Sequence, residues 1–358
     1  MSPRKEVLSR AAEPQVASAG GPDRKVSPEL QELEASVDTS LRPNSLAEFV
    51  GQEDLKSHLR IMLEAAKRRG QSADHFLFAG PPGLGKTSLA SIIAHEMGTG
   101  FRVTSGPALV RGGDLAAILT SLHGGDVLFI DEIHRLSTAV AEILYPAMED
   151  YKLDIIIGEG PTARSIRLDL PEFTLVGATT RTGMITGPLR DRFGFVARLD
   201  YYKPEELCQI VERSSRILGV NTNPEGAREI ASRSRGTPRL ANRLLRRVRD
   251  YVEVKADGVI TRDSARKGLD IFGVDELGLD KVDRSILNAL CRTYSGRPIG
   301  LSTLAVTVGE EPETIEDVYE PFLMQSGLIV RTARGRIPGP LAWQHLGLEI
   351  PPASAPLF

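Results

Sequence analysis

Eight consecutive residues, Gly80 to Thr87, read GPPGLGKT, with glycine at the first and sixth positions and Lys-Thr directly after. This spacing is typical of a Walker A loop, whose backbone N–H groups surround the β-phosphate of a nucleoside triphosphate. A strand-like run, His75 to Ala79, precedes the loop, and small and apolar residues from Ser88 to Met97 follow it. Strand, loop and helix N-terminus together form an anion site. The sequence therefore predicts a nucleotide site in which Lys86 neutralises the β/γ charge.

A second part of this site follows the apolar run Val127 to Ile130, which is typical of a strand buried on both faces of a parallel sheet. The run ends in Asp131 and Glu132. The Asp131 carboxylate and the Thr87 hydroxyl suit Mg²⁺, and Glu132 is placed to polarise a water for attack on the γ-phosphate. A kinase for a small molecule would not need that glutamate. We therefore expect hydrolysis of a nucleoside triphosphate, with His134 a loop or packing residue rather than a metal ligand because no His/Cys cluster accompanies it.

Another buried strand is predicted from Leu175 to Arg181, and it also ends in polar residues. If this strand lies beside the strand that carries Asp131, either Thr179 or Thr180 lies near the γ-phosphate.

Arginines in two later segments suggest a ring-shaped ATPase. Arg190 and Arg192 lie in the short segment Leu189 to Phe193. In ring ATPases an arginine at this place reaches the neighbouring subunit's γ-phosphate and contributes about 10³- to 10⁵-fold in rate. The alternative is a surface arginine without a role. Arg239 follows the helix start Thr237-Pro238, so we expect it to point toward the nucleotide.

Composition narrows the class of protein. With 358 residues, 41% of them hydrophobic and 25% charged, the chain is typical of a soluble protein of two or three domains. The net charge of −3 gives no global attraction to nucleic acid, so any DNA contact must come from a local patch. There is no membrane-spanning run or signal core, and Cys208 and Cys291 are expected to be packed thiols. We expect a cytoplasmic protein.

Changes in pattern along the chain predict its domains. The first residues lack periodic apolar positions, strands and helices alternate next, and the remainder is helical until a hairpin near the end. The expected parts are a disordered tail at 1–38, an α/β core with a parallel sheet at 39–203, a helical lid at 204–277, a winged helix at 278–347 and a tail at 348–358.

The winged helix combines three helices, 280–294, 301–308 and 312–326, with a hairpin at 328–337. The third helix, usually the one that reads a DNA groove, is acidic, and phosphate would repel it. The hairpin is basic, so we expect Arg331, Arg334 and Arg336 to contact the DNA backbone without sequence preference. The alternative is a solvated turn on an interaction domain. The acidic positions are Glu313, Glu316, Asp317 and Glu320.

A second hairpin is predicted from Leu153 to Leu170, around a Gly-Glu-Gly-Pro turn. On its second strand Ile166 and Leu168 alternate with charged residues, and this period of two predicts one apolar face. From the residues alone this is half-buried sheet.

Taken together, these segments resemble one family, the RuvB Holliday-junction branch-migration motors among the AAA+ ATPases. The resemblance runs from about Leu41 to Gly347 and is carried by GPPGLGKT, LFIDEIHR, IGEGPTARSIRLDLPEFTLVGATTR, PLRDRFG, GTPRLANRLLRRVRDY and VRTARGR. It implies a homo-hexamer that uses ATP and Mg²⁺ to pump double-stranded DNA at Holliday junctions in recombination and repair. It also implies the junction-recognition subunit RuvA as a partner and the RuvC resolvase in a larger complex.

The resemblance also implies roles for individual residues. Around the nucleotide it places Leu41 and Arg42 at the adenine, Tyr202 at the base or sugar, Gly83, Gly85, Lys86, Thr87 and Ser88 at the phosphates, and Glu149, Asp150 and Tyr151 in a further segment of the site. In catalysis it assigns Lys86, Asp131, Glu132, Thr179 as sensor 1, Arg192 ahead of Arg190 as the finger and Arg239 as sensor 2, with Thr87 and Asp131 at Mg²⁺. Arg331 and Arg336 match its DNA-contacting wing, and Ile166 and Leu168 match its docking site for RuvA.

Two other functions are considered. A winged-helix replication initiator or regulator would carry a base-reading helix, which the acidic third helix disfavours. A clamp loader or protein-remodelling ATPase would lack the basic wing or carry an aromatic pore loop. The long N-terminal tail and Thr182-Gly183-Met184 depart from the family pattern without touching a residue named above.

Overall fold

The computed structural model describes residues 40–157 and 164–350. The chain divides into two compact units between Leu41 and Arg42, and every element below belongs to the second unit. The tail expected at 1–38, the turn between the strands of the first hairpin and the last eight residues lie outside the described residues.

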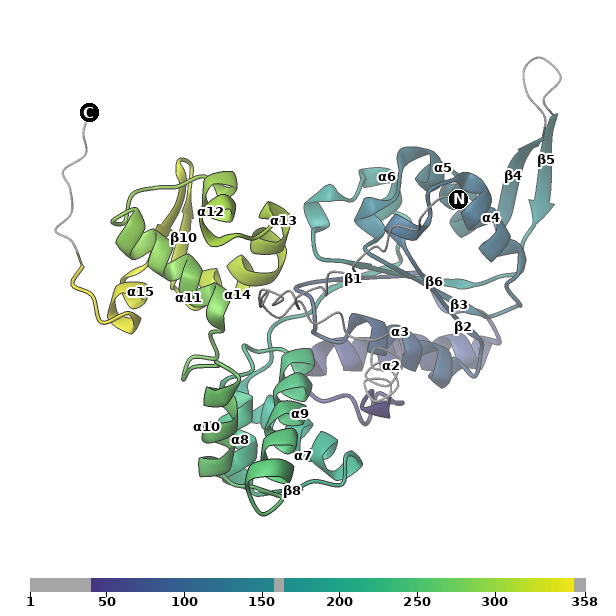
Figure 1. Ribbon diagram of the computed structural model, residues 1–358. Helices are drawn as coiled ribbons and strands as arrows, with labels where there is room; N and C mark the ends of the chain where they lie inside the picture. Colours follow the sequence, from purple (N-terminus) through teal and green to yellow (C-terminus); the bar gives the residue numbers. More distant parts are fainter. Residues whose placement is uncertain (1–39, 158–163, 351–358) are drawn as a thin grey trace, which may run out of the picture. The chain divides into compact units, whose positions relative to one another are not determined.

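A five-stranded parallel sheet forms the centre of the α/β part (Figure 1), in the order β2-β3-β6-β1-β7. The P-loop strand β1 therefore lies between β6 and β7, and β3 lies between β2 and β6. All residues of β1 and β6 are buried, as the apolar sequences predict. The strands are β1 (Phe76–Ala79), β2 (Phe101–Ser105), β3 (Val127–Asp131), β6 (Thr174–Thr179) and β7 (Phe195–Arg198).

Helices cover both faces of this sheet, because successive strand residues point to opposite sides. Phe76 and Phe78 pack in one core with α2 (Glu53–Arg69) and α3 (Lys86–Met97), whereas Leu77 packs in a second core with α4 and α5. Figure 1 shows α2 and α3 on one side and α4, α5 and α6 on the other. This arrangement confirms the predicted α/β core. The second layer consists of α4 (Gly112–Thr120), α5 (Thr138–Glu149) and α6 (Gly187–Arg190).

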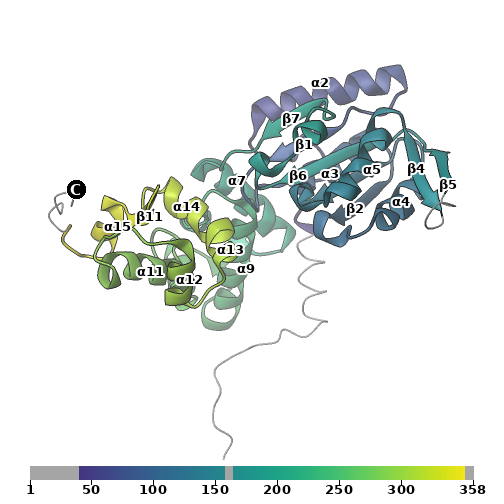
Figure 2. The same ribbon diagram turned by 90° about the horizontal axis from the view of Figure 1, so that it is seen from above.

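The hairpin predicted from Leu153 to Leu170 is present as β4 (Lys152–Ile157) and β5 (Arg164–Asp169), which pair antiparallel. It extends beyond the edge of the sheet in both views (Figure 1, Figure 2). Leu153 lies opposite Leu168, and Asp154 lies opposite Arg167. The Arg167 guanidinium donates to both Asp154 oxygens, at 2.7 and 2.8 Å, which fixes this register.

Four helices follow within the helical lid predicted at 204–277, and a short parallel pair of strands joins their loops. The apolar stripe of the third helix, which includes Leu244 and Val248, is buried. Its core is continuous with the α2–α3 side of the sheet. The elements are α7 (Pro204–Ile217), α8 (Pro224–Ser232), α9 (Pro238–Lys255), α10 (Arg262–Ile271), β8 (Asn221–Thr222) and β9 (Val259–Ile260).

The C-terminal part has its own core and the expected winged-helix order. Its first and third helices each contain a π-helical turn, at Ala289–Thr293 and Ile315–Tyr319. One helix after the wing was not predicted, and its Trp343 is buried in the core. The elements are α11 (Lys281–Asn288), α12 (Leu301–Val308), α13 (Pro312–Thr314), α14 (Glu320–Gln325), β10 (Ile329–Thr332), β11 (Gly335–Pro338) and α15 (Pro340–His345).

No helix in the described ranges is long and apolar enough to cross a bilayer. Within those ranges no group of three His, Cys, Asp or Glu side chains could hold a metal ion. Cys208 and Cys291 are free thiols, half-buried and buried respectively.

Candidate functional site

The predicted phosphate loop connects β1 to α3, and glycine is required at two of its positions. Gly83 and Gly85 have φ angles of 83° and 101°. A Cβ on Gly83 would lie 3.1 Å from Cβ of Arg239, and a Cβ on Gly85 would lie 3.1 Å from the ring of Phe49. Left-handed backbone and close neighbours together exclude larger residues. The loop is thus shaped to leave its backbone accessible at the start of α3, where Thr87 and Ser88 are half-buried.

Lys86 is buried at the first residue of α3, and its Nζ donates to the carbonyl oxygens of Gly80 and Pro81 at 2.7 and 2.8 Å. Burial lowers the pKa of Lys86 to about 8, Asp131 acts to raise it and Arg239 acts to lower it further. The two charges affect Lys86 because loop, strand end and lid helix converge on it. A buried amine held only by loop carbonyls fits a site in which a polyphosphate would become its partner.

The Walker B carboxylates lie at the end of β3. Asp131 is half-buried, and its Oδ1 accepts the backbone N–H of Glu132 at 3.0 Å. Glu132 has a φ of 49°, which is uncommon for a residue other than glycine. Its Oε2 accepts from Arg135 Nη1 at 3.2 Å. In the described state, therefore, the predicted water-polarising carboxylate is paired with a neighbouring arginine.

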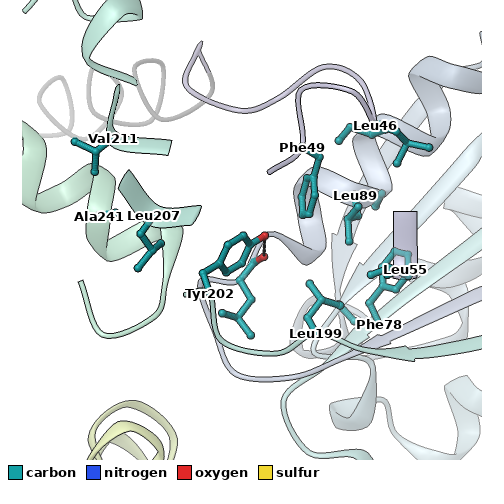
Figure 3. Close-up of a cluster of buried hydrophobic side chains, with 14 of the residues drawn as sticks. Leu46, Phe49, Leu55, Phe78, Leu89, Leu199, Tyr202, Leu207, Val211 and Ala241 are labelled. Carbon is teal, nitrogen blue, oxygen red and sulfur yellow. Dashed lines mark hydrogen bonds between the residues drawn. The ribbon is translucent and has the colours of Figure 1, made fainter. Parts of the chain in front are cut away.

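The lid helix α9 contacts the loop through its first turn. The Arg239 N–H donates to the Gly83 carbonyl at 3.3 Å. Tyr202, placed by sequence at the base or sugar, is buried, and its hydroxyl donates to the Leu84 carbonyl at 3.2 Å. Figure 3 shows the Tyr202 ring near Phe49. Burial raises the pKa of Tyr202. The Tyr202 hydroxyl thus binds the backbone of the phosphate loop.

The end of β6 is connected to the Walker B segment by a side-chain bridge. Thr179 is buried, and its Oγ1 lies 3.0 Å from His134 Nδ1. The Arg181 N–H donates to the same oxygen at 3.0 Å. Burial lowers the pKa of His134, which favours the neutral ring. Thr179 is thus bonded to His134, and Thr180 is the neighbouring half-buried hydroxyl.

Arg192 is held on its own subunit by α5 and α6. Its Nη1 donates to the Pro188 carbonyl at 2.6 Å and its Nη2 to Glu149 Oε2 at 3.0 Å. The guanidinium carbon also lies 4.5 Å from the centre of the Tyr145 ring. Arg190 is exposed. Glu149, whose physical role is not evident from the sequence, is thus paired with the predicted finger Arg192 in this structure.

The other predicted nucleotide residues are less closely gathered. Tyr151 has a φ of 53° and packs edge-on against the rings of His75 and Phe173. Asp150 is exposed at the end of α5. Leu41 is buried and Arg42 is exposed. Within this chain Glu149 to Tyr151 thus belongs to the side of the molecule that holds Arg192, rather than to the loop that holds Lys86.

The three arginines of the wing differ in their exposure to solvent. The side chain of Arg331 is 55% exposed and pairs with Glu316 at 3.1 Å, and Arg334 is exposed near the hairpin tip. Arg336, in contrast, is buried, and it pairs with the fully buried Glu320 through Nε–Oε1 at 2.6 Å and Nη2–Oε2 at 3.2 Å. The expectation that Arg336 reaches DNA therefore needs correction for the described state, because its guanidinium is committed to an internal carboxylate.

Ile166 and Leu168 remain 44% and 36% exposed on β5, so the part of the chain that the structure describes does not cover this face of the hairpin. Three further residues were missed by sequence reasoning: Arg135, the bridging role of His134, and Arg181, which pairs with acids of the winged helix. The only signal for them was their position, since each lies within three residues of a predicted catalytic residue.

Comparisons with known proteins agree along the whole described chain. Models of the Holliday junction DNA helicase RuvB P-loop domain, the RuvB AAA lid domain and the RuvB C-terminal winged-helix domain match residues 41–199, 202–275 and 276–347. The branch migration complex subunit RuvB of Mycolicibacterium smegmatis is 60% identical over 329 residues, 92% of this chain and 94% of that one. That of Nocardioides sp. is 59% identical over 319 residues, 89% of each chain. The solved Thermotoga maritima RuvB Holliday junction branch migration motor is 50% identical with a TM-score of 0.79, covering 87% of this chain and 100% of that one.

Proposed function

This chain belongs to the RuvB family, and from that premise we propose that its described site couples ATP hydrolysis to the branch migration of Holliday junctions in homologous recombination and DNA repair. The observation that carries the proposal is the division of the catalytic groups. Lys86, Asp131 and Arg239 converge on one loop, whereas Arg192 is held separately by α5 and α6. A site divided in this way is completed by a second subunit, which is the arrangement of a homo-hexameric ring.

In this proposal residues 39–203 and 204–277 form the ATPase and its lid. Gly83, Gly85 and the first turn of α3 bind the phosphates, and Lys86 and Arg239 neutralise their charge. Mg²⁺, if held by the Thr87 hydroxyl and the Asp131 carboxylate, has the hard oxygen ligands that it prefers and would offset charge between the β- and γ-phosphates. Glu132 orients the attacking water once it leaves Arg135. Thr179 positions the Walker B segment through His134.

Arg192 then acts on the ATP bound by the neighbouring subunit, and Glu149 keeps it in place until the ring closes. Stabilisation of transferring phosphate by such an arginine is worth about 10³- to 10⁵-fold in rate. The adenosine end of the nucleotide is flanked by Leu41, Arg42 and Tyr202. The segment Glu149 to Tyr151 belongs to the interface between subunits rather than to the phosphate loop of its own subunit. The clamp-loader alternative is disfavoured by the basic wing.

The test mixes two inactive variants. Arg192→Ala should bind ATP and not hydrolyse it, and Lys86→Ala should not bind it. Rings that contain both variants include some interfaces with an intact loop and an intact finger, so ATP turnover should return in part. Arg190→Ala is the matched control, two residues away and exposed, and should retain turnover. Absence of recovery in rings that demonstrably assemble would refute action between subunits.

DNA binding is assigned to residues 278–347, with Arg331 and Arg334 contacting phosphates and Arg336 supporting the wing from inside. The apolar face of Ile166 and Leu168 is the proposed docking site for RuvA, with RuvC in a larger complex. We propose a cytoplasmic location for the motor, because its proposed substrate is DNA. Ile166→Ser with Leu168→Ser should abolish co-elution with RuvA and leave ATP turnover intact. If co-elution persists, RuvA docks elsewhere.

A further inference from the structure

Carboxylates of the third winged-helix segment are occupied by arginines from two parts of the chain. This segment, Pro312–Gln325, is called the acidic helix below. Its Glu316 and Asp317 bind Arg181, its Glu316 also binds the wing residue Arg331, and its Glu320 binds the buried Arg336. A helix that repels phosphate therefore has another use, which is to bind guanidinium groups.

Arg181 contacts two carboxylates of the acidic helix. Its Nε and Nη2 donate to Asp317 Oδ1 at 3.0 and 2.6 Å, and Nη2 also donates to Glu316 Oε2 at 3.2 Å. The Arg181 side chain is 31% exposed, so water does not fully screen these charges. Two carboxylates on one guanidinium form a network, and networks contribute where isolated surface pairs do not.

The main chain of the same residue is fixed at the nucleotide site. The Arg181 N–H donates to Thr179 Oγ1, which bonds to His134 two residues after Glu132. Arg181 thus has its backbone at the end of β6 and its guanidinium on the acidic helix. A displacement of the β6 end when the nucleotide changes would move that guanidinium directly.

Glu316 connects this contact to the wing. Its Oε2 accepts from Arg181, and its Oε1 accepts from Arg331 Nη1 at 3.1 Å. One carboxylate therefore bridges a residue of the sensor strand and a residue of the wing. A DNA phosphate that takes Arg331 would remove one of the three arginines around Glu316 and leave Arg181 and the Nη2 of Arg336, which lies 3.9 Å from Oε1. More of the Glu316 charge would then act on Arg181, so DNA binding and the Arg181 contact should strengthen each other.

We propose that the acidic helix is a docking surface for Arg181, and that Arg181 is a positioning residue that couples the nucleotide site to the DNA-binding wing. The inference rests on the proposed function. It assigns Asp317 to the nucleotide side alone and Glu316 to both sides. By thermodynamic linkage, if DNA alters the affinity for nucleotide through this surface, nucleotide alters the affinity for DNA by the same factor.

The test compares two neutralised acids in the full chain. Asp317→Asn should keep basal ATP turnover and lose most of the stimulation by duplex DNA. It should also remove the difference in DNA affinity between the states bound to ADP and to a non-hydrolysable ATP analogue. Glu316→Gln should lose the same coupling and, because Arg331 is released, bind duplex DNA about two- to fivefold more tightly. Glu313→Gln, an exposed acid of the same helix, is the matched control and should behave as wild type.

A double-mutant cycle with Arg181→Gln separates the coupling between nucleotide site and wing from effects on stability. If the pair acts as one unit, the double variant Arg181→Gln/Asp317→Asn loses no more stimulation than either single variant. Multiplying losses would overturn the inference, as would full stimulation and unchanged nucleotide dependence in Asp317→Asn. A wild-type chain that duplex DNA does not stimulate would instead count against the proposed function itself.

Discussion

Replacing Arg336 by alanine should destabilise the winged helix rather than remove a direct contact to DNA. The Arg336 side chain is 8% exposed, and its partner Glu320 is fully buried. Removing the guanidinium leaves an internal carboxylate without its counter-charge. Breaking a buried pair from one side costs about 3–5 kcal/mol, which is a large part of the stability of a small domain.

The double replacement Arg336→Leu/Glu320→Leu should be much less harmful, because it removes both charges and leaves apolar groups of similar size. Replacing a buried pair in this way is often neutral or stabilising, by up to about 4 kcal/mol. The contrast between single and double variants therefore measures the cost of the unpaired carboxylate. A general packing defect would instead make the double variant the worse of the two.

The chain contains one tryptophan, Trp343, and it is buried in the winged-helix core beside Gly296. Its fluorescence in a denaturant titration therefore reports the unfolding of this domain within the intact protein. The unfolding transition of the Arg336→Ala variant should move to a lower denaturant concentration, and its unfolding free energy should fall by the amount given above. Arg331→Ala, whose side chain is 55% exposed, should change the unfolding free energy by no more than about 1 kcal/mol.

DNA titrations at several salt concentrations complete the test. Arg331→Ala should lower the slope of log affinity against log salt by about 1 and do so equally for two unrelated duplexes. If Arg336→Ala kept its stability within about 1 kcal/mol and lowered the slope as much as Arg331→Ala, the buried-pair argument would be refuted, and Arg336 would be a direct phosphate contact.

Three further outcomes are expected. Burial lowers the pKa of Lys86 to about 8, and a bound polyphosphate would raise it. ATP affinity should therefore be constant below about pH 8 and weaken up to tenfold per pH unit above it. Titrating a fluorescent ATP analogue from pH 7 to 9.5 checks this, and an affinity that does not change with pH contradicts it. Thr179→Val should lower ATP turnover through His134, and comparison with Thr180→Val in single-turnover assays decides which hydroxyl serves as the sensor. His75 bonds the Met148 carbonyl and the Leu175 N–H, and burial lowers its pKa, so on acidification the unfolded state takes up a proton at a higher pH than the folded state. The unfolding free energy should therefore fall as pH drops below about 6.5. His75→Phe should remove this pH dependence at a cost of about 1–3 kcal/mol, measured by circular dichroism in denaturant.

Local patterns were sufficient for much of the molecule. The loop Gly80–Thr87, the strand before Asp131 and the lid helices were predicted because motif spacing and apolar period are written within short segments. The convergence of Lys86, Asp131 and Arg239 also followed, since strand ends of a parallel sheet meet at one edge.

Contacts between distant residues could not be predicted in the same way. Thr179 and His134 are 45 positions apart, and Arg192 and Glu149 are 43 apart. Each residue taken alone is an ordinary polar side chain near a motif. Their pairing depends on how β6 and α5 pack against the segments beside them, which no local period encodes.

The wing illustrates a different limit. Arg331 and Arg336 lie opposite each other on β10 and β11, and in sequence both are simply arginines of a basic turn. Burial separates them, because Arg336 also lies beside Ile299, where the two backbones exchange hydrogen bonds, and Glu320 supplies its counter-charge from the acidic helix. Charge in a sequence indicates a partner but does not say whether that partner is inside or outside the protein.

The hydrophobic core shared by the sheet and the lid has a consequence for how the chain unfolds and tolerates substitution. Phe78 and Leu89 on the sheet side belong to the same buried cluster as Leu207 and Val211 on α7 (Figure 3), whereas the winged helix has a cluster of its own. Sheet and lid should therefore melt as a single calorimetric unit, separately from the domain that carries Trp343. Truncating Leu207 would then loosen the loop that carries Lys86, and a temperature-sensitive defect in ATP turnover would arise from a residue that touches no nucleotide.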